Sequence, residues 1–368
     1  MKTPVAAIRR EIEVREAITF ARFMELALYD PATGYYETGR DRVGCAGDFI
    51  TSVSTGEMFG QLLAFQFADW LAGLPRFHGR LCLIEAGAHD GKLALDILRW
   101  LQRCRPELFT EIDYWILEPS IFRQSWQKET LKEFIPRVGW FLGFEDLKLK
   151  IPESKITGVI FSNELLDAFP VHRYGWSAGE RKWFEWGVRW ERDRFTWAQL
   201  NLLSPILSGL PADLLAVLPD GYSVEISPAA EHWWQQAAGI LSDGKLVAID
   251  YGFTSAEQFS PARIRGTLRA YRQHRLSDDL LAHPGDQDLT AHVNLSAIQK
   301  AGEDAGLVTE GICTQAQFLT RILAAARKEK SLADLTARQV RQFQTLTHPE
   351  HFGRAFQALV QSTPARVS

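Results

Sequence analysis

Cysteine is scarce in this chain: its 368 residues include only four, which lie far apart and form no C-x-x-C pair. This pattern favours a reducing compartment over a disulfide framework. No stretch shows the spacing of a metal-binding motif, so we expect no metal site. His348 and His351 are three residues apart, but no carboxylate motif accompanies them, and we interpret them as surface residues.

Long apolar runs and a strong charge bias are also absent. No apolar segment approaches the roughly 18 residues that cross a bilayer. The first residues, MKTPVAAIRREIEV, lack the apolar core of a signal peptide, and their acidic residues are unlike a transit peptide. The 41 Lys and Arg residues are outnumbered by 45 Asp and Glu residues, which argues against broad binding to nucleic acid. We expect a cytoplasmic protein that binds neither membranes nor nucleic acid.

Apolar residues make up 46% of the chain, enough for one large α/β domain with insertions or for two domains. The most informative stretch is residues 81–98, LCLIEAGAHDGKLALDIL, which predicts a strand, a tight loop and a helix. In open α/β sheets, ligands bind at the carboxyl ends of such strands. The loop is bracketed by Gly87 and Gly91, but His89 stands where a G-x-G pattern has its second glycine. Alone, this stretch allows either a dinucleotide or S-adenosylmethionine.

A second strand is expected over residues 111–117, followed by a helix capped by Ser120. Glu118 ends this strand, where a carboxylate can accept hydrogen bonds from the two hydroxyls of a ribose. Further strands are expected at residues 137–142 and 157–161. They complete the first half of a doubly wound sheet.

The fourth strand leads into a polar loop that ends at Pro170. Asn163, Glu164 and Asp167 are expected to project from this loop toward the same crevice, because the proline prevents a long helix. A capped structural turn is the alternative interpretation. Position alone does not separate the two.

The N-terminal region predicts helices over residues 8–16 and 21–28, followed by a glycine-rich loop. That loop supplies side chains suited to binding: Tyr35, Tyr36, Asp48, Phe49 and Thr51. For Tyr35 and Tyr36, a packed turn is the alternative. Ser54 and Glu57 form an S-x-x-E pattern that predicts a capping box at the next helix.

Residues 171–219 are rich in tryptophan and predict an inserted β-hairpin. Residues 222–226, 228–241 and 245–250 are then expected to resume the α/β alternation. Toward the end of the chain we expect helices at 295–305, 315–326 and 332–345, and strands at 307–313 and 354–361.

Several motifs occur in an order that resembles one family, the MidA-type class I S-adenosylmethionine-dependent methyltransferases. Its mitochondrial members act as complex I assembly proteins and protein-arginine methyltransferases. The resemblance runs almost end to end and rests on FMELALYDPATGYY, GDFIT, MFG, the 85–91 loop, EPSIFRQ, NELLDAFP, IDYG, GTLRAYRQH, DLTAHV and QAQFL.

This resemblance implies a Rossmann-like, seven-stranded, mostly parallel sheet with a reversed final strand. It also implies an N-terminal helical lid and cofactor-covering loop over residues 1–53 and a first part of the core over 54–170. A substrate-side insertion would span 171–220, and the rest of the core, with a C-terminal helical insertion, would span 221–368.

The resemblance further implies roles for individual residues around S-adenosylmethionine. The loop beside the methionine part of the cofactor would contain Glu85, Gly87, His89 and Gly91, and Glu118 would bind the ribose. The N-terminal cover would include Asp48, Phe49 and Thr51. The catalytic loop beside the methyl group would contain Asn163, Glu164 and Asp167.

The expected reaction is methyl transfer, acting on a protein arginine. Glu164 could pair with the guanidinium, orient one nitrogen and help to remove its proton, while Asp167 assists or braces the loop. A small-molecule methyltransferase with the tryptophan-rich insertion as its pocket is one alternative. A non-catalytic assembly factor with a degenerate loop is another, and a nicotinamide dehydrogenase is weaker. Assembly is left open, with a homodimer as one option.

Two departures from the family pattern bear on these expectations. His89 replaces a glycine in the cofactor loop, where its ring could crowd the cofactor, bond to it or face solvent. Asn294 replaces the aspartate that ends the D-L-T-x-H-V-D stretch, which makes the family's substrate uncertain for this chain.

Overall fold

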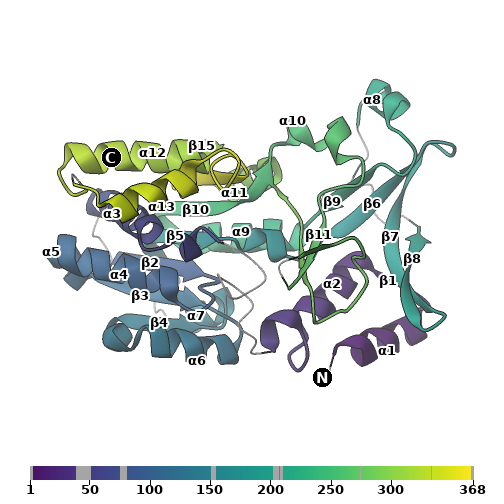
Figure 1. Cartoon of the computed structure of the whole chain (residues 1–368), viewed down its shortest axis with the longest axis horizontal. Coiled ribbons are helices and arrows are strands. Elements are labelled where there is room, and N and C mark those ends of the chain that lie inside the picture. Colours follow the sequence, from purple (N-terminus) through teal and green to yellow (C-terminus); the bar gives the residue numbers. More distant parts are fainter. Residues whose placement is uncertain are drawn as a thin grey trace.

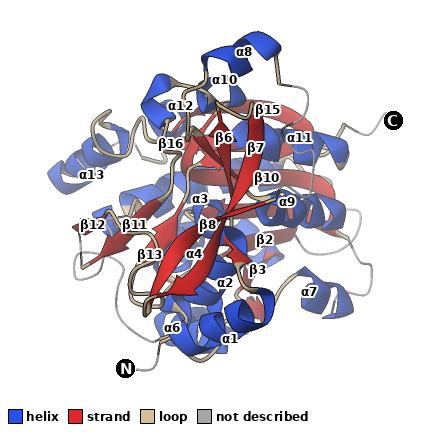
Figure 2. Cartoon of the chain, turned by 90° about the vertical axis from the view of Figure 1, so that its right-hand side faces the viewer, coloured by secondary structure: helices blue, strands red, loops and turns tan. Residues whose placement is uncertain are grey.

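A computed structural model describes residues 3–38, 51–74, 81–150, 155–201, 207, 210–273, 275–332 and 334–365. The chain forms a large sheet covered by helices and a smaller second sheet beside it (Figure 1). Seen from the side, the second sheet lies in front of the first (Figure 2).

The large sheet has the topology expected from the sequence. In the described chain, its order is β4 (Val138–Phe141), β3 (Ile112–Leu117), β2 (Leu81–Ala86), β5 (Ile156–Asn163), β10 (Leu241–Phe253), β16 (Phe356–Ser362) and β15 (Val308–Thr314). The first five are parallel, whereas β16 is antiparallel to both of its neighbours. The short strand β14 (Val293–Asn294) pairs with the end of β10. The prediction of a mostly parallel sheet with a reversed final strand is confirmed.

Helices cover both faces of this sheet, as they must because its central strands are apolar on both sides. One face packs against α3 (Met58–Ala72), α4 (Lys92–Cys104), α12 (Gln315–Lys328) and α13 (Ala337–Thr347). The other face packs against α7 (Phe144–Lys150), α9 (Pro228–Ile240) and α11 (Leu295–Asp304). The helices α5 (Pro106–Glu111) and α6 (Ile121–Thr130) flank β3 in sequence. Strand β2 is buried along its whole length, which fixes the loop that follows it.

The second sheet is larger than the hairpin that the sequence predicts. It contains β1 (Ile18–Thr19), β7 (Lys182–Glu191), β6 (His172–Ser177), β9 (Ser223–Ile226) and β8 (Arg194–Leu200). Strand β9 was expected to resume the core, but it pairs with β6, because Val224 packs in a cluster with Tyr174 and Tyr222. The division of the chain into units at the expected boundaries stays a prediction.

The N-terminal helices α1 (Val5–Arg15) and α2 (Phe20–Tyr29) pack against the second sheet. The Phe20 ring lies 5.2 Å from Trp197, and the Arg9 guanidinium lies 4.6 Å from the Trp190 ring. Trp190 and Trp197 of the insertion therefore form part of the contact between the N-terminal helices and this sheet. A short helical turn, η1 (Tyr35–Glu37), follows α2.

The remaining elements are a third sheet and short helices. A three-stranded sheet consists of β12 (Arg275–Ser277), β11 (Arg269–Arg272) and β13 (Asp288–Thr290). Short helices are α8 (Ala212–Val217) and α10 (Ser255–Gln258), with helical turns at η2 (Val53–Thr55), η3 (Lys132–Arg137), η4 (Leu166–Ala168) and η5 (Pro261–Arg263). The described helices include none with the length and apolar character of a membrane span.

The expected capping box is not formed. Helix α3 begins at Met58, and the Ser54 hydroxyl donates instead to the Thr51 carbonyl oxygen at 2.8 Å. The turn η2 thus replaces the first turn of the predicted helix.

Candidate functional site

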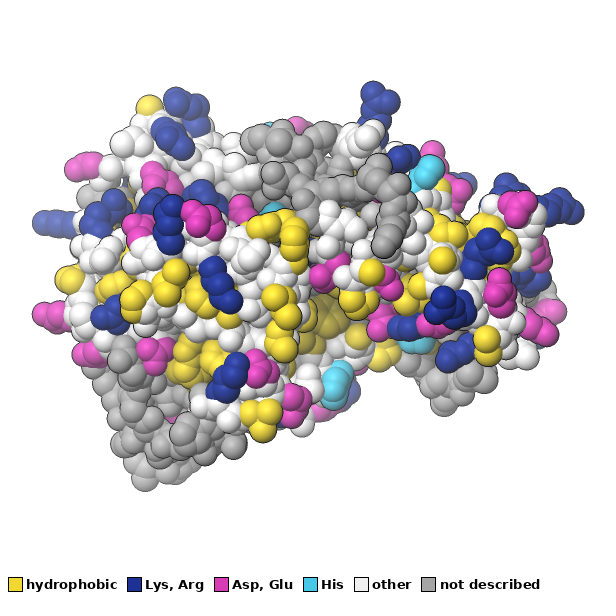
Figure 3. Space-filling view, turned by 90° about the horizontal axis from the view of Figure 1, so that it is seen from below, with side chains coloured by type: hydrophobic (Ala, Val, Ile, Leu, Met, Phe, Trp, Pro, Cys, Tyr) yellow, Lys and Arg dark blue, Asp and Glu magenta, His cyan; other side chains and the backbone are white. Residues whose placement is uncertain are grey.

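A cavity of about 1250 Å³ opens at the carboxyl edge of the large sheet, between that sheet and the N-terminal helices. Figure 3 shows the surface hollowed here, with hydrophobic side chains at the base of the hollow. The loops after β2, β3 and β5 and the strand β10 all contribute to its lining. This is the edge where ligands bind in open α/β sheets.

The loop after β2 adopts a conformation that requires its glycines. Gly87 has a φ of 71°, and a Cβ placed there would lie 2.8 Å from the Leu165 Cδ1 atom. Gly91 has a φ of 82° and begins α4. Since this left-handed region is costly for other residues, both positions favour glycine.

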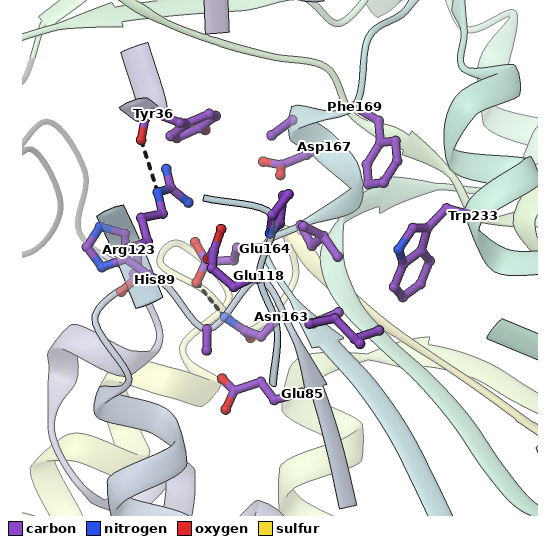
Figure 4. Close-up of a pocket in the computed structure, with 18 of the residues that line it drawn as sticks. Tyr36, Glu85, His89, Glu118, Arg123, Asn163, Glu164, Asp167, Phe169 and Trp233 are labelled. Carbon is purple, nitrogen blue, oxygen red and sulfur yellow. Dashed lines mark hydrogen bonds between the residues drawn. The ribbon is translucent and has the colours of Figure 1, made fainter. Parts of the chain in front are cut away.

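His89 occupies the same loop in the left-handed region, with a φ of 46°. Its carbonyl oxygen accepts a hydrogen bond from Gln127 Nε2 at 3.0 Å, and its ring lies edge-on to Trp126 at 6.2 Å. Figure 4 shows the ring to one side of the acidic side chains of the cavity. The histidine therefore fits the loop without filling the centre of the cavity.

Glu118 is a buried carboxyl group at the end of β3, with only 2% of its surface exposed. Its Oε1 accepts a hydrogen bond from the Ser120 N–H, and its Oε2 accepts one from Gln127 Nε2, both at 3.1 Å. Burial raises the pKa of this carboxyl. Each oxygen can accept a second hydrogen bond, so both stay able to bind a hydroxyl in the cavity.

Glu85 lies deeper, on β2. Its Oε2 accepts a hydrogen bond from the Tyr114 hydroxyl at 2.5 Å. Burial raises the pKa of Glu85 to about 8, so this group is mainly neutral at pH 7.

The loop after β5 presents two of the three predicted catalytic side chains as a pair. Asn163 Nδ2 donates to Glu164 Oε1 at 3.0 Å, and the Ser52 N–H donates to the same oxygen at 3.2 Å. Glu164 has a φ of 52°, and its N–H donates to the Ile249 carbonyl oxygen at 2.9 Å. Burial, with a contribution from the Asp250 charge, raises the pKa of Glu164 to about 8.

Asp167 lies on the same loop and is also buried. Burial comes first in raising the pKa of Asp167 well above its ordinary value, and the neighbouring charges of Asp250, Glu164 and Asp288 add to this effect. Asp167 faces the cavity beside Glu164 (Figure 4). The structure thus brings all three predicted side chains of this loop together.

Sequence reasoning missed Asp250, which holds this loop in place from β10. Its Oδ2 accepts hydrogen bonds from the N–H groups of Leu166 at 2.8 Å and Leu165 at 3.1 Å, and its Oδ1 accepts one from Tyr251 at 2.9 Å. The reasoning applied to Glu118, a carboxylate at the end of a strand, would have found it in the IDYG motif. We call Glu164, Asp167 and Asp250 the acidic centre.

Two tyrosines close the cavity from the N-terminal side. The Tyr29 hydroxyl donates to the Ala168 carbonyl oxygen at 2.9 Å, and the Tyr36 hydroxyl donates to Asp288 Oδ1 at 2.8 Å. Arg123 Nε donates to the Tyr36 carbonyl oxygen at 3.1 Å (Figure 4). The Tyr29 bond joins α2 to η4, and the bonds of Tyr36 join η1 to α6 and to β13.

Of the predicted covering residues, Thr51 lines the cavity, whereas Asp48 and Phe49 lie outside the described residues. From the tryptophan-rich insertion, His172 lines the cavity, whereas Trp176 packs against Trp183 at 5.3 Å. A pocket formed by this insertion stays a prediction. The aromatic lining comes instead from Phe169 and Trp233.

Asn294 has a structural role. Its side chain caps α11 by accepting the Ala297 N–H at 3.3 Å, and it does not line the cavity. Asparagine and aspartate are both good helix caps, so this departure leaves the cavity unchanged.

Comparison with known proteins identifies the cofactor of this chain. A family model described as "Putative S-adenosyl-L-methionine-dependent methyltransferase" matches residues 62–313. A crystal structure of a likely methyl transferase from Burkholderia thailandensis, bound to S-adenosyl-homocysteine, is 32% identical with a TM-score of 0.83. The match covers 98% of this chain and 91% of that one.

Curated relatives extend over nearly the same length. Protein arginine methyltransferase NDUFAF7, mitochondrial, from Danio rerio is 27% identical over 95% of this chain and 85% of its own. The Homo sapiens protein of the same name is 28% identical over 92% of this chain and 78% of its own. Because these relatives are named as mitochondrial, the expected cytoplasmic location is wrong by this comparison.

The described residues fit S-adenosylmethionine as the cofactor. The two carboxyl oxygens of Glu118 are oriented to accept hydrogen bonds from a diol. In the loop after β2, Gly87 and Gly91 have no side chains that would fill the cavity. A family model that spans more than half of the chain agrees with this fit. The chain belongs to the MidA-type family of S-adenosylmethionine-dependent methyltransferases.

Proposed function

We propose that this enzyme methylates the guanidinium group of a protein arginine and that Glu164 and Asp167 of the acidic centre bind this cation. The observation that carries the proposal is the charge around Asp167. The neighbouring charges that act on it are those of Asp250, Glu164 and Asp288, all of them acidic. Buried carboxyl groups without a neutralising cation are costly, and a cationic acceptor would relieve that cost. The name of the curated relatives, protein arginine methyltransferase, supports the same acceptor.

The cofactor is assigned to the other half of the cavity. In this proposal Glu118 binds the ribose, and Glu85, Gly87, His89 and Gly91 form the loop beside the methionine part. Thr51 belongs to the cover over the cofactor, for which Asp48 and Phe49 stay predictions. S-adenosylmethionine, when bound, supplies an electrophilic methyl group.

Glu164 is proposed as the group that orients the acceptor and receives its proton. Its Oε1 is already held by Asn163 and Ser52, so its Oε2 is the oxygen left to accept a guanidinium N–H. Approach of a cation favours the ionised carboxylate and lowers its raised pKa. Once the nitrogen carries the new methyl group, its N–H proton can pass to this carboxylate.

Asp167 is proposed as a second anchor for the cation, and Asn163 as the side chain that fixes Glu164. The backbone around Asp167 is rigid, because its carbonyl oxygen accepts the Ala291 N–H at 2.9 Å. Held at two carboxylates, a guanidinium would keep one nitrogen directed at the methyl group. Such positioning and exclusion of water account for much of the rate enhancement in reactions of this type.

The test is methyl transfer from labelled S-adenosylmethionine to a cell lysate, followed by separation of protein and small molecules. We expect label in the protein fraction, recovered as methylarginine after acid hydrolysis. Glu164→Gln and Asp167→Asn should each reduce this transfer. Label confined to small molecules would instead support a small-molecule methyltransferase. Full transfer by both variants would contradict the assigned roles.

A further inference from the structure

We infer that Tyr251 is a further acceptor-binding residue, whose hydroxyl oxygen accepts an N–H of the guanidinium beside Glu164 and Asp167. This inference rests on the proposed arginine acceptor and adds a neutral third contact to it. Tyr251 lies near the end of β10 and lines the cavity.

The register of the sheet places the side chains of Tyr251 and Asp250 on opposite faces of β10. Ile249 of β10 pairs with Asn163 of β5. Because side chains alternate along a strand, Tyr251 projects to the same face as Ile249, whereas Asp250 projects to the opposite face. Strand β10 therefore contributes two residues to the site. Asp250 accepts hydrogen bonds from the backbone of the loop after β5, and Tyr251 lines the cavity.

The Tyr251 ring is held in a fixed position. Its centroid lies 3.9 Å from that of Phe356, its partner on the neighbouring strand β16, and 6.1 Å from the stacked ring of His292. Burial lowers the pKa of His292 to about 4, so this neighbouring ring is neutral at physiological pH. The packing restricts the hydroxyl to a small region of the cavity.

The Tyr251 hydroxyl is free to bind a ligand. The described residues give it no hydrogen-bond partner, in contrast to the hydroxyls of Tyr29 and Tyr36. Burial raises the pKa of Tyr251, and Glu164 and Asp167 are the first neighbouring charges to add to this effect. The phenol therefore keeps its proton and lies within the influence of both carboxyl groups.

A hydroxyl at this position suits a guanidinium. It can donate its proton to a carboxylate and accept an N–H at the same time. A guanidinium carries five N–H donors in one plane, so a hydroxyl oxygen can accept an N–H that the two carboxylates leave unpaired. A neutral acceptor on a rigid ring adds orientation without adding charge.

Calorimetry with ethylguanidinium as the probe tests this inference. The protein is saturated with S-adenosylhomocysteine, and the affinity for ethylguanidinium is compared between the wild type and Tyr251→Phe. Loss of one hydrogen bond should weaken binding about fivefold to tenfold. The affinity for S-adenosylhomocysteine should not change, because the ring and its packing are kept.

Tyr222→Phe is the matched control. The Tyr222 hydroxyl donates to the carbonyl oxygens of Gln258 and Ser260 and does not line the cavity. Its loss should lower thermal stability and leave ethylguanidinium binding unchanged.

The outcomes separate this inference from the proposed function. Equal ethylguanidinium affinity in the wild type and Tyr251→Phe would overturn the role of Tyr251 and leave the arginine acceptor standing. A loss confined to S-adenosylhomocysteine affinity would assign Tyr251 to the cofactor instead. If the wild type does not bind ethylguanidinium, the arginine acceptor fails, and this inference fails with it.

Discussion

The Asp250 carboxylate lies behind the acidic loop and accepts the N–H of Leu166 at 2.8 Å. Asp250 is fully buried, and the loop that it holds contains Glu164 in a left-handed conformation. The position of Glu164 therefore depends on a carboxylate from a different strand. This dependence can be tested separately from the chemistry.

Asp250→Asn should destabilise the protein and impair methyl transfer. The amide retains one acceptor oxygen and turns an N–H toward backbone donors, which leaves buried N–H groups unpaired. We expect the free energy of unfolding to fall by about 1–3 kcal/mol in urea titrations. Asp304→Asn, at an exposed ion pair with Lys300, is the control and should change stability by less than about 1 kcal/mol. A wild-type stability and activity for Asp250→Asn would refute the positioning role.

Stability should fall with rising pH because of Glu85. Its pKa is about 8 in the folded protein and 4.5 ordinarily, so between these values the folded state holds a proton that the unfolded state has released. The free energy of unfolding then falls by up to about 1.4 kcal/mol per pH unit for this group.

Glu85→Gln mimics the protonated acid and can still accept the Tyr114 hydroxyl. Urea titrations of the ligand-free protein between pH 5.5 and 7.5 should show a shallower slope for this variant by about one proton. Part of the slope should persist, because the pKa of Glu164 is raised in the same way. An unchanged slope would mean that Glu85 is ionised in the folded protein.

Glu118→Gln should weaken cofactor binding. It removes the charge from an acceptor that is already oriented by Ser120 and Gln127. Hydrogen bonds to charged groups contribute more than neutral ones, so calorimetry should show about a 10- to 100-fold higher Kd for S-adenosylhomocysteine. Glu129→Gln, at an exposed ion pair of α6, should bind normally. Normal binding by Glu118→Gln would move the ribose elsewhere.

His89→Gly tests the unusual loop residue. Glycine adopts the left-handed backbone without strain but loses about 0.5–1 kcal/mol through greater freedom of the unfolded chain, so thermal stability should change little. Cofactor affinity should stay the same or improve, because the ring lies to one side of the acidic groups (Figure 4). A large loss of affinity measured by calorimetry would show that the histidine contacts the cofactor.

The large sheet and three of its loops could be predicted from sequence because their signals are local. Ser120 caps α6 as expected, by accepting the Arg123 N–H at 3.3 Å, and Gly91 begins α4. A buried strand followed by turn residues and an amphipathic run is readable without knowledge of the rest of the chain.

Features that depend on distant partners could not be predicted in this way. Asp250 acts on Leu165 and Leu166 only because β10 lies beside β5, and Tyr36 bonds to Asp288 across most of the chain. Strand β9 was predicted as a core strand because it precedes a helix and a further strand, and its pairing with β6 and the packing of Val224 with Tyr174 assign it to the second sheet. Each of these misjudgements involves a contact whose partner is far away in sequence.

The pairing of β1 with β7 has a consequence for how the enzyme is made. Ile18 is synthesised early, but its partner Val188 follows only after the catalytic loop has emerged from the ribosome. Contacts between such distant residues form slowly during folding. The strand β1, which leads into α2, therefore cannot pair until β7 has been synthesised. Pairing of β1 therefore requires synthesis to pass Val188, near the middle of the 368 residues.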